Sequence, residues 1–205
     1  MLDKNKFITI WETITKNINA EKVLDDAVEQ YNNSSRYYHN LQHIESCLAL
    51  LDKYKNLAKN YNTLYLAIIF HDYIYDPSSI YNEIDSACAF MIKTHIFPVN
   101  EPDNPIAKVI ELILATKHDK ILTNSDEQLI ADIDLSSLGL PTEEFDKNWE
   151  NIRKEFWFID DNKFLGSRLK ILNELANKKH IFYHQEFINE FEEQARKNIK
   201  GWTAK

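Results

Sequence analysis

The chain has 205 residues, a formal net charge of −8, and 44% apolar and 27% charged residues. This length suits a single domain with a sizeable core, and the residue balance is that of a globular protein rather than a disordered one. The acidic balance disfavours general nucleic-acid binding, because displacing counterions from a phosphate backbone needs a broad cationic surface.

Glycine and proline are scarce, at 3 and 5 residues. Sheets joined by tight hairpins need many such residues, so their scarcity favours long helices. No long apolar run follows the N-terminus, and no stretch has the length of a membrane span. Cys47 and Cys88 lie in apolar helical patterns, which predicts two buried thiols in a reducing compartment. We therefore predict a cytoplasmic, all-α, single-domain protein over residues 1–205 with no membrane contact.

The periodicity of apolar residues predicts the helices in chain order. Residues 64–72 are apolar nearly all round, which indicates a buried central helix, with a buried strand as the alternative. Pro98, Pro102 and Pro105 are expected to close the helix before them. The other helices are expected at about 3–31 (two helices), 41–58, 83–95, 106–116, 129–138, 143–158, 161–178 and 184–199, with a break at 34–40.

His71 and Asp72 end the most apolar segment of the chain. Burying an imidazole and a carboxylate without partners costs several kcal/mol. A buried divalent metal ion would remove that cost, since both groups are good ligands. Taken alone, the dipeptide fits a hydrogen-bonded His–Asp pair at a helix end better than a metal site.

His39 and His43 form a second cluster of candidates. If their helix begins before His39, a spacing of four puts both imidazoles on one face. That face continues into Cys47, so His43 is expected to point inward. Arg36 precedes the pair and could hold a phosphate, which a guanidinium contacts with two hydrogen bonds.

Two further groups of polar residues stand out. Asp132 and Asp134 interrupt an apolar stretch, where they need a partner; helix capping or an ion pair to a lysine is the simpler explanation. Lys117 and His118 follow the expected helix over 106–116, where cationic side chains are also favoured by the helix dipole alone.

In sequence order these residues form the pattern H…HD…D, which resembles the signature of the HD superfamily of predicted metal-dependent phosphohydrolases. The 28 residues between His43 and His71 suit two consecutive helices. The resemblance spans nearly the whole chain, and its ordered set of blocks is more specific than any single block. The blocks that carry it are residues 36–44, 70–75, 82–87, 115–118, 132–139, 152–156 and 195–198.

The resemblance implies an HD-domain-like helical bundle with a metal site on central helices. His43, His71 and Asp72 match the first three ligands. The fourth is open: Ala131–Asp132 matches the Ala-Asp step of many members, whereas Asp134 matches the second carboxylate of an Asp-x-Asp step. We favour Asp134, and expect only one of the two to reach the ion because residues two apart in a helix face different ways.

We expect hydrolysis of a small phosphorylated substrate, such as a nucleotide, by one divalent ion: Mn, Fe, Co, Ni, Zn or Mg. Mixed ligands do not select among these ions. Asp72 or Glu83 is expected to accept the proton of a bound water. Arg36, His39 and Lys117 are expected to bind the substrate, with His118 in a catalytic role. The alternative is a non-catalytic metal-binding or ligand-sensing module.

Overall fold

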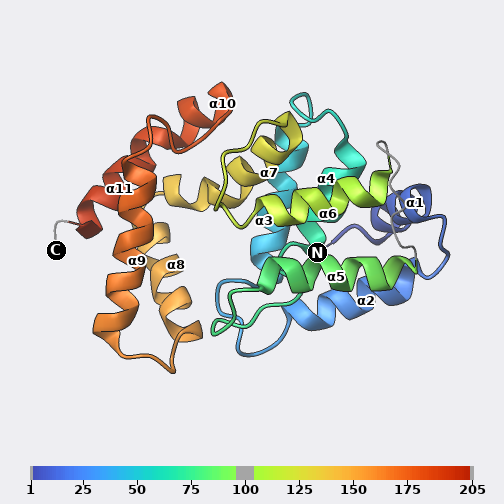
Figure 1. The fold of residues 1–205 in the computed structure, drawn as a ribbon, viewed down its shortest axis with the longest axis horizontal. Helices are drawn as coiled ribbons and strands as arrows, with labels where there is room; N and C mark the ends of the chain where they lie inside the picture. Colours follow the sequence, from blue (N-terminus) through green and yellow to red (C-terminus); the bar gives the residue numbers. More distant parts are fainter. Residues whose placement is uncertain (1, 96–103, 204–205) are drawn as a thin grey trace. The chain divides into compact units, whose positions relative to one another are not determined.

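The computed structural model describes residues 2–95 and 104–203, and within these ranges it contains helices and helical turns but no strand (Figure 1). The all-α prediction is therefore confirmed for the part of the chain that is described. The chain divides into two compact units, residues 1–130 and 131–205, each described below by itself. A single domain over 1–205 stays a prediction, since compactness alone does not define a domain.

The first unit is organised around one buried helix, α4, which packs against α1, α3, α5 and α6. All residues from Thr63 to Phe70 of α4 are buried, so the apolar run is a central helix rather than the alternative strand. The helices of this unit are α1 (Lys4–Thr15), α2 (Ala20–Tyr31), α3 (Leu41–Lys53), α4 (Tyr61–Phe70), α5 (Asn82–Thr94) and α6 (Pro105–Ala115).

Asparagine side chains set the starts of the helices that matter for the site. Asn40 accepts hydrogen bonds from the backbone N–H groups of Gln42 and His43, so α3 begins at Leu41. His39 therefore precedes the helix, in agreement with the predicted start at residue 41, and the condition under which His39 and His43 would share a helical face is not met. Asn60 caps α4 in the same way.

The prolines after α5 also differ from expectation. Pro98 and Pro102 lie outside the described residues. Pro105 is the first residue of α6, directly after the capping Asn104, so it opens a helix rather than closing one. The first helical position tolerates proline because its missing N–H would have no partner there.

The second unit begins within α7 (Ser125–Leu135), which crosses from residue 130 to 131. Its 3₁₀ turn η1 packs closely on the π-helix η2. A Cβ on Gly139 would lie 2.6 Å from both the Cβ and the carbonyl oxygen of Phe191, so only glycine fits at that contact. The remaining elements are η1 (Ser136–Gly139), α8 (Thr142–Glu155), α9 (Asp161–Ala176), α10 (Gln185–Phe187), η2 (Ile188–Glu192) and α11 (Glu193–Thr203).

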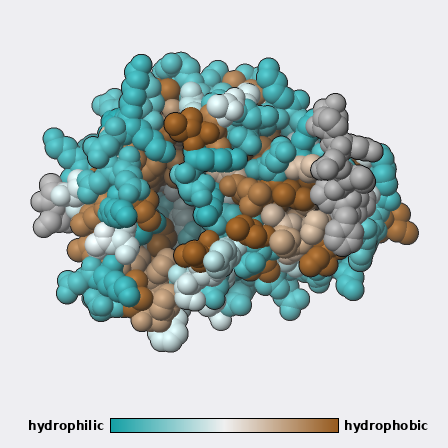
Figure 2. Space-filling model, viewed as in Figure 1, coloured by the Kyte–Doolittle hydropathy of each residue, from teal (hydrophilic) through white to brown (hydrophobic). Residues whose placement is uncertain are grey.

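The surface combines charged side chains with several exposed apolar ones, and Figure 2 shows hydrophilic residues around smaller apolar patches. Trp157 and Phe158, between α8 and α9, are exposed. Cys47 is buried but Cys88 is exposed, so the prediction of two buried thiols was half wrong. Among the described helices, none has both the length and the apolar character required to cross a membrane.

Candidate metal centre

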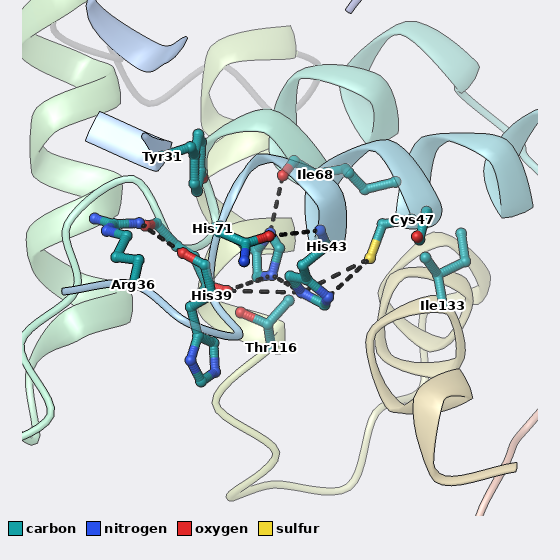
Figure 3. Close-up of polar contacts among 12 residues, drawn as sticks. Tyr31, Arg36, His39, His43, Cys47, Ile68, His71, Thr116 and Ile133 are labelled. Carbon is teal, nitrogen blue, oxygen red and sulfur yellow. Dashed lines mark hydrogen bonds and ion pairs between the residues drawn. The ribbon is translucent and has the colours of Figure 1, made fainter. Parts of the chain in front are cut away.

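The first unit brings His43, His71 and Asp72 together, as the sequence predicted. Figure 3 shows the two histidines side by side. The two Nε2 atoms lie 3.3 Å apart. Asp72 Oδ2 lies 3.1 Å from His71 Nε2 and 3.7 Å from His43 Nε2. The side chains are 7%, 3% and 15% exposed for His43, His71 and Asp72, so all three are largely withdrawn from water.

The backbone of α4 fixes the tautomer of His71. Its Nδ1 lies 2.9 Å from the carbonyl oxygen of Ile68. A carbonyl can only accept, so Nδ1 carries the hydrogen, and a neutral His71 has its lone pair on Nε2. That lone pair faces Asp72 Oδ2 and His43 Nε2. A carbonyl partner on the far nitrogen is a common arrangement for a metal-binding histidine.

The three donor atoms have the separations expected of ligands on one ion. Two nitrogens bound tetrahedrally at about 2.0–2.1 Å lie roughly 3.3 Å from each other. The separations of 3.1, 3.3 and 3.7 Å are close to that value. Two imidazoles and one carboxylate also suit the divalent first-row metals. The residues therefore fit a divalent ion.

Electrostatics at the cluster favour a charged carboxylate. Burial opposes ionisation of Asp72, but the charges of His71, His39 and His43 and a hydrogen bond with His71 outweigh it and lower the pKa of this carboxyl. Asp72 is therefore an anion when a cation occupies the cluster, whether that cation is a proton or a metal ion.

The thiol of Cys47 lies at the edge of the cluster, one helical turn after His43. Its Sγ is 3.8 Å from His43 Nδ1. The sequence predicted this neighbour from the spacing of four along α3.

Arg36 does not point its donors at a substrate site. Its Nη1 donates to the carbonyl oxygens of Asp72 and His39, at 2.6 and 3.3 Å, and its Nη2 donates to that of Tyr73 at 2.9 Å. The residue is 9% exposed. These contacts favour a structural task over the predicted phosphate contact.

His39 lies beside the cluster, and its ring stacks on Tyr75 with centroids 4.1 Å apart. Its ring is also edge-on to Tyr38, at 4.8 Å. Both tyrosines are partly exposed, so His39 belongs to an aromatic wall next to the proposed ligands. Its role in substrate binding stays a prediction.

The other predicted catalytic and binding residues lie at the ends of α5 and α6. Glu83 is in the first turn of α5 and is half-buried. Lys117 forms an ion pair of 3.0 Å with Asp119, which raises the pKa of its ammonium, with a smaller contribution from Glu83. His118 has a left-handed backbone with φ of 57°. Their roles in catalysis stay predictions.

The two late aspartates belong to the second unit and differ in environment. Asp132 is 1% exposed and accepts from the backbone N–H groups of Tyr183 and His184, at 2.7 and 2.8 Å. His184 Nδ1 lies 2.9 Å from Oδ2 of the same carboxylate. Asp132 is thus engaged in holding residues 183–184, whereas Asp134 is half-buried. The choice between Asp132 and Asp134 as the fourth ligand stays a prediction.

Sequence reasoning missed the residues that hold this scaffold. His184 is 52 residues from Asp132, and no spacing rule connects them. Asp126 accepts from the backbone N–H groups of Lys59 and Asn60, at 2.7 and 2.9 Å, and so fixes the start of α4. The polar residues around Asp126 gave no indication in the sequence that its side chain is buried.

Comparison with family models, with curated proteins and with solved structures gives no match to this chain. The assignment of chemistry therefore depends on the geometry of the cluster.

Proposed function

We propose that this protein is a metal-dependent hydrolase acting on a small phosphorylated substrate, with His43, His71 and Asp72 as protein ligands and Asp134 as the fourth. The observation that carries the proposal is the convergence of two imidazole Nε2 atoms and one carboxylate oxygen within 3.1–3.7 Å. The order of these residues also resembles the HD signature, which supports phosphoester hydrolysis over other reactions of bound metals.

A divalent ion held by these residues would supply an activated water at neutral pH and polarise a phosphoryl oxygen. The chain's own residues would orient the ligands and accept the proton of the water. The Ile68 carbonyl holds His71 in the tautomer that presents Nε2. The second oxygen of Asp72, or Glu83 at the start of α5, would accept the proton released by water.

The substrate would bind on the open side of the cluster. Tyr38, His39 and Tyr75 form a partly exposed aromatic wall beside the ligands. Such a wall suits a flat group such as a nucleobase, because aromatic rings favour offset stacking. Lys117 and His118 would contact the phosphate from the loop after α6.

The test has two stages, elemental analysis of purified protein followed by a phosphoester panel assayed with each candidate ion. We expect about one ion per chain and turnover that is lost in His71→Ala. His184→Ala is the matched control, because it removes a half-buried imidazole paired with an aspartate in the second unit. Bound metal without turnover would identify the non-catalytic module instead. Absence of metal would refute the centre.

A further inference from the structure

Arg36 links the two segments that carry the proposed ligands. It lies in the loop between α2 and α3, and its guanidinium donates both to the carbonyl of His39, just before α3, and to those of Asp72 and Tyr73, just after α4. One side chain therefore ties the loop that leads into His43 to the turn that contains His71 and Asp72, as Figure 3 shows in part.

The guanidinium adds hydrogen bonds to the turn that directly follows α4. The last carbonyls of a helix lack partners within it and need donors from elsewhere. Those of Ile68, Ile69 and Phe70 accept from His71 Nδ1, Tyr31 Oη and Tyr73 N, at 2.9, 2.8 and 3.2 Å. Arg36 donates to two carbonyls beyond the helix, those of Asp72 and Tyr73 in the following turn, and its positive charge is favoured near a helix C-terminus.

Aromatic rings hold the guanidinium in place. Its central carbon lies 5.1 Å from the ring centre of Tyr31 and 5.7 Å from that of Tyr75. Burial raises the pKa of the Tyr31 hydroxyl well above its ordinary value, so the hydroxyl stays protonated and donates to Ile69. The guanidinium of Arg36 is thus fixed by hydrogen bonds from its N–H groups and by the neighbouring rings of Tyr31 and Tyr75.

We propose that Arg36 is a positioning residue that sets the turn carrying His71 and Asp72, and so fixes the ligand geometry before any ion binds. This inference rests on the proposed metal centre. It replaces the phosphate contact expected from the sequence, because the guanidinium is directed at backbone carbonyls of the chain itself. A residue that supports ligands without touching the ion typically changes metal affinity by about 10- to 100-fold.

Two substitutions of Arg36 test the inference, each compared with a matched control. Arg36→Met removes every donor and keeps an apolar stem. Arg36→Lys keeps the charge but loses the planar fork. The control is Arg153→Met in the second unit, whose guanidinium likewise donates to two loop carbonyls, those of Phe156 and Ile159, at 2.7 and 3.0 Å.

Two properties are measured for each full-length variant. The first is the Kd for Co²⁺, determined by titration. The second is the set of side-chain ¹⁵N shifts of the histidines in metal-free protein, which report the tautomer of each ring. We expect Arg36→Met to weaken Co²⁺ binding by about 10- to 100-fold and to move the His71 signals away from a single tautomer. In Arg36→Lys, the Kd for Co²⁺ and the His71 ¹⁵N shifts should lie between those of Arg36→Met and the wild type. Arg153→Met should change neither property.

The outcomes separate this inference from the proposed function. Unchanged Kd and unchanged His71 shifts in Arg36→Met would overturn the positioning role and leave Arg36 as a contributor to stability only. If Arg36→Met fails to fold, the same two results in Arg36→Lys decide the matter. If the wild-type protein binds no Co²⁺, the metal centre fails, and the metal-free ¹⁵N shifts still show whether Arg36 sets the His71 turn.

Discussion

Each unit of the molecule contains a His–Asp pair that is largely withdrawn from water. The two pairs differ in which groups donate hydrogen bonds to the carboxylate. In the second unit, Asp132 receives the N–H groups of Tyr183 and His184 and the Nδ1 of His184, so one carboxylate meets three donors. In the first unit, His71 directs its Nδ1 hydrogen away to Ile68 and turns its lone pair toward Asp72 and His43.

The donors around the carboxylate distinguish a structural His–Asp pair from a candidate metal site. Three donors around a carboxylate satisfy it without any further component. Two imidazole Nε2 atoms and a carboxylate oxygen that face one point lack such a set of backbone donors, and either a proton or a metal ion among them satisfies the group. Burial alone does not distinguish the pairs, since both are largely withdrawn from solvent.

The largest effect should come from removing a proposed ligand. Asp72→Ala leaves the two imidazoles without the anion of the set, so we expect stoichiometric metal binding to disappear. The loss should exceed the 10- to 100-fold typical of residues that only support ligands. Equilibrium dialysis against Zn²⁺ measures it. Full occupancy in Asp72→Ala would remove this residue from the ligand set.

Catalysis should depend on His118 without any loss of metal. We expect His118→Asn to keep the ion and to lower phosphoester turnover by about 10²- to 10⁴-fold, as for the loss of a proton donor. Asparagine is chosen because it tolerates the left-handed backbone of this position better than alanine does. Wild-type turnover in this variant would show that His118 only ends the turn after α6.

The two aspartates of α7 should separate stability from metal affinity. Asp132→Ala leaves buried N–H groups without their acceptor, and we expect a loss of about 3 kcal/mol or more in the free energy of unfolding, with metal stoichiometry kept. Asp134→Ala should weaken metal binding and change the stability of the metal-free protein little. Urea unfolding and metal titration of both variants measure the two quantities. The reverse ranking in the titration would move the fourth ligand to Asp132.

Metal binding should stabilise the wild-type protein through linkage. At an ion concentration of about 100 times Kd, the free energy of unfolding should rise by about 2.7 kcal/mol. For a chain of this size, that corresponds to a melting temperature higher by roughly 5–10 °C. His71→Ala should show no such rise, while His184→Ala should show it in full from a lower starting temperature. If metal raised the melting temperature of His71→Ala as much as that of the wild type, the ion would bind elsewhere.

The smallest effects concern packing in the second unit. Gly139→Ala puts a Cβ against Phe191 and should cost about 1–3 kcal/mol of stability. Gly166→Ala, in open space on α9, should stabilise by about 0.5–1 kcal/mol. Neither substitution should change metal stoichiometry. Thermal unfolding of each variant with and without metal measures its stability and its stabilisation by the ion. A loss of metal in Gly139→Ala would show that the packing of η1 on η2 supports the centre.

The sequence allowed prediction of the helices and of the three converging residues. The apolar run of α4 predicts its burial, and the order of His43, His71 and Asp72 in the pattern H…HD…D predicted that these residues converge. The sequence could not show what Arg36 contacts, because a guanidinium donates to a phosphate and to a backbone carbonyl with the same N–H groups. The sequence left open whether His39 lies on the same helix as His43; the cap at Asn40 starts α3 at Leu41, as predicted, so His39 lies before it. The His184–Asp132 pair depends on a contact between distant segments, which no local pattern encodes.

The X-ray absorption spectrum of the Zn²⁺-loaded protein would identify the ligands of the ion. Two imidazoles and carboxylate oxygens should give nitrogen and oxygen neighbours at about 2.0–2.2 Å with the multiple scattering of histidine rings, and the ring signal should decrease in His71→Ala. A sulfur shell at about 2.3 Å, indicating Cys47 as a ligand, or a spectrum without imidazole, would contradict the proposed ligand set.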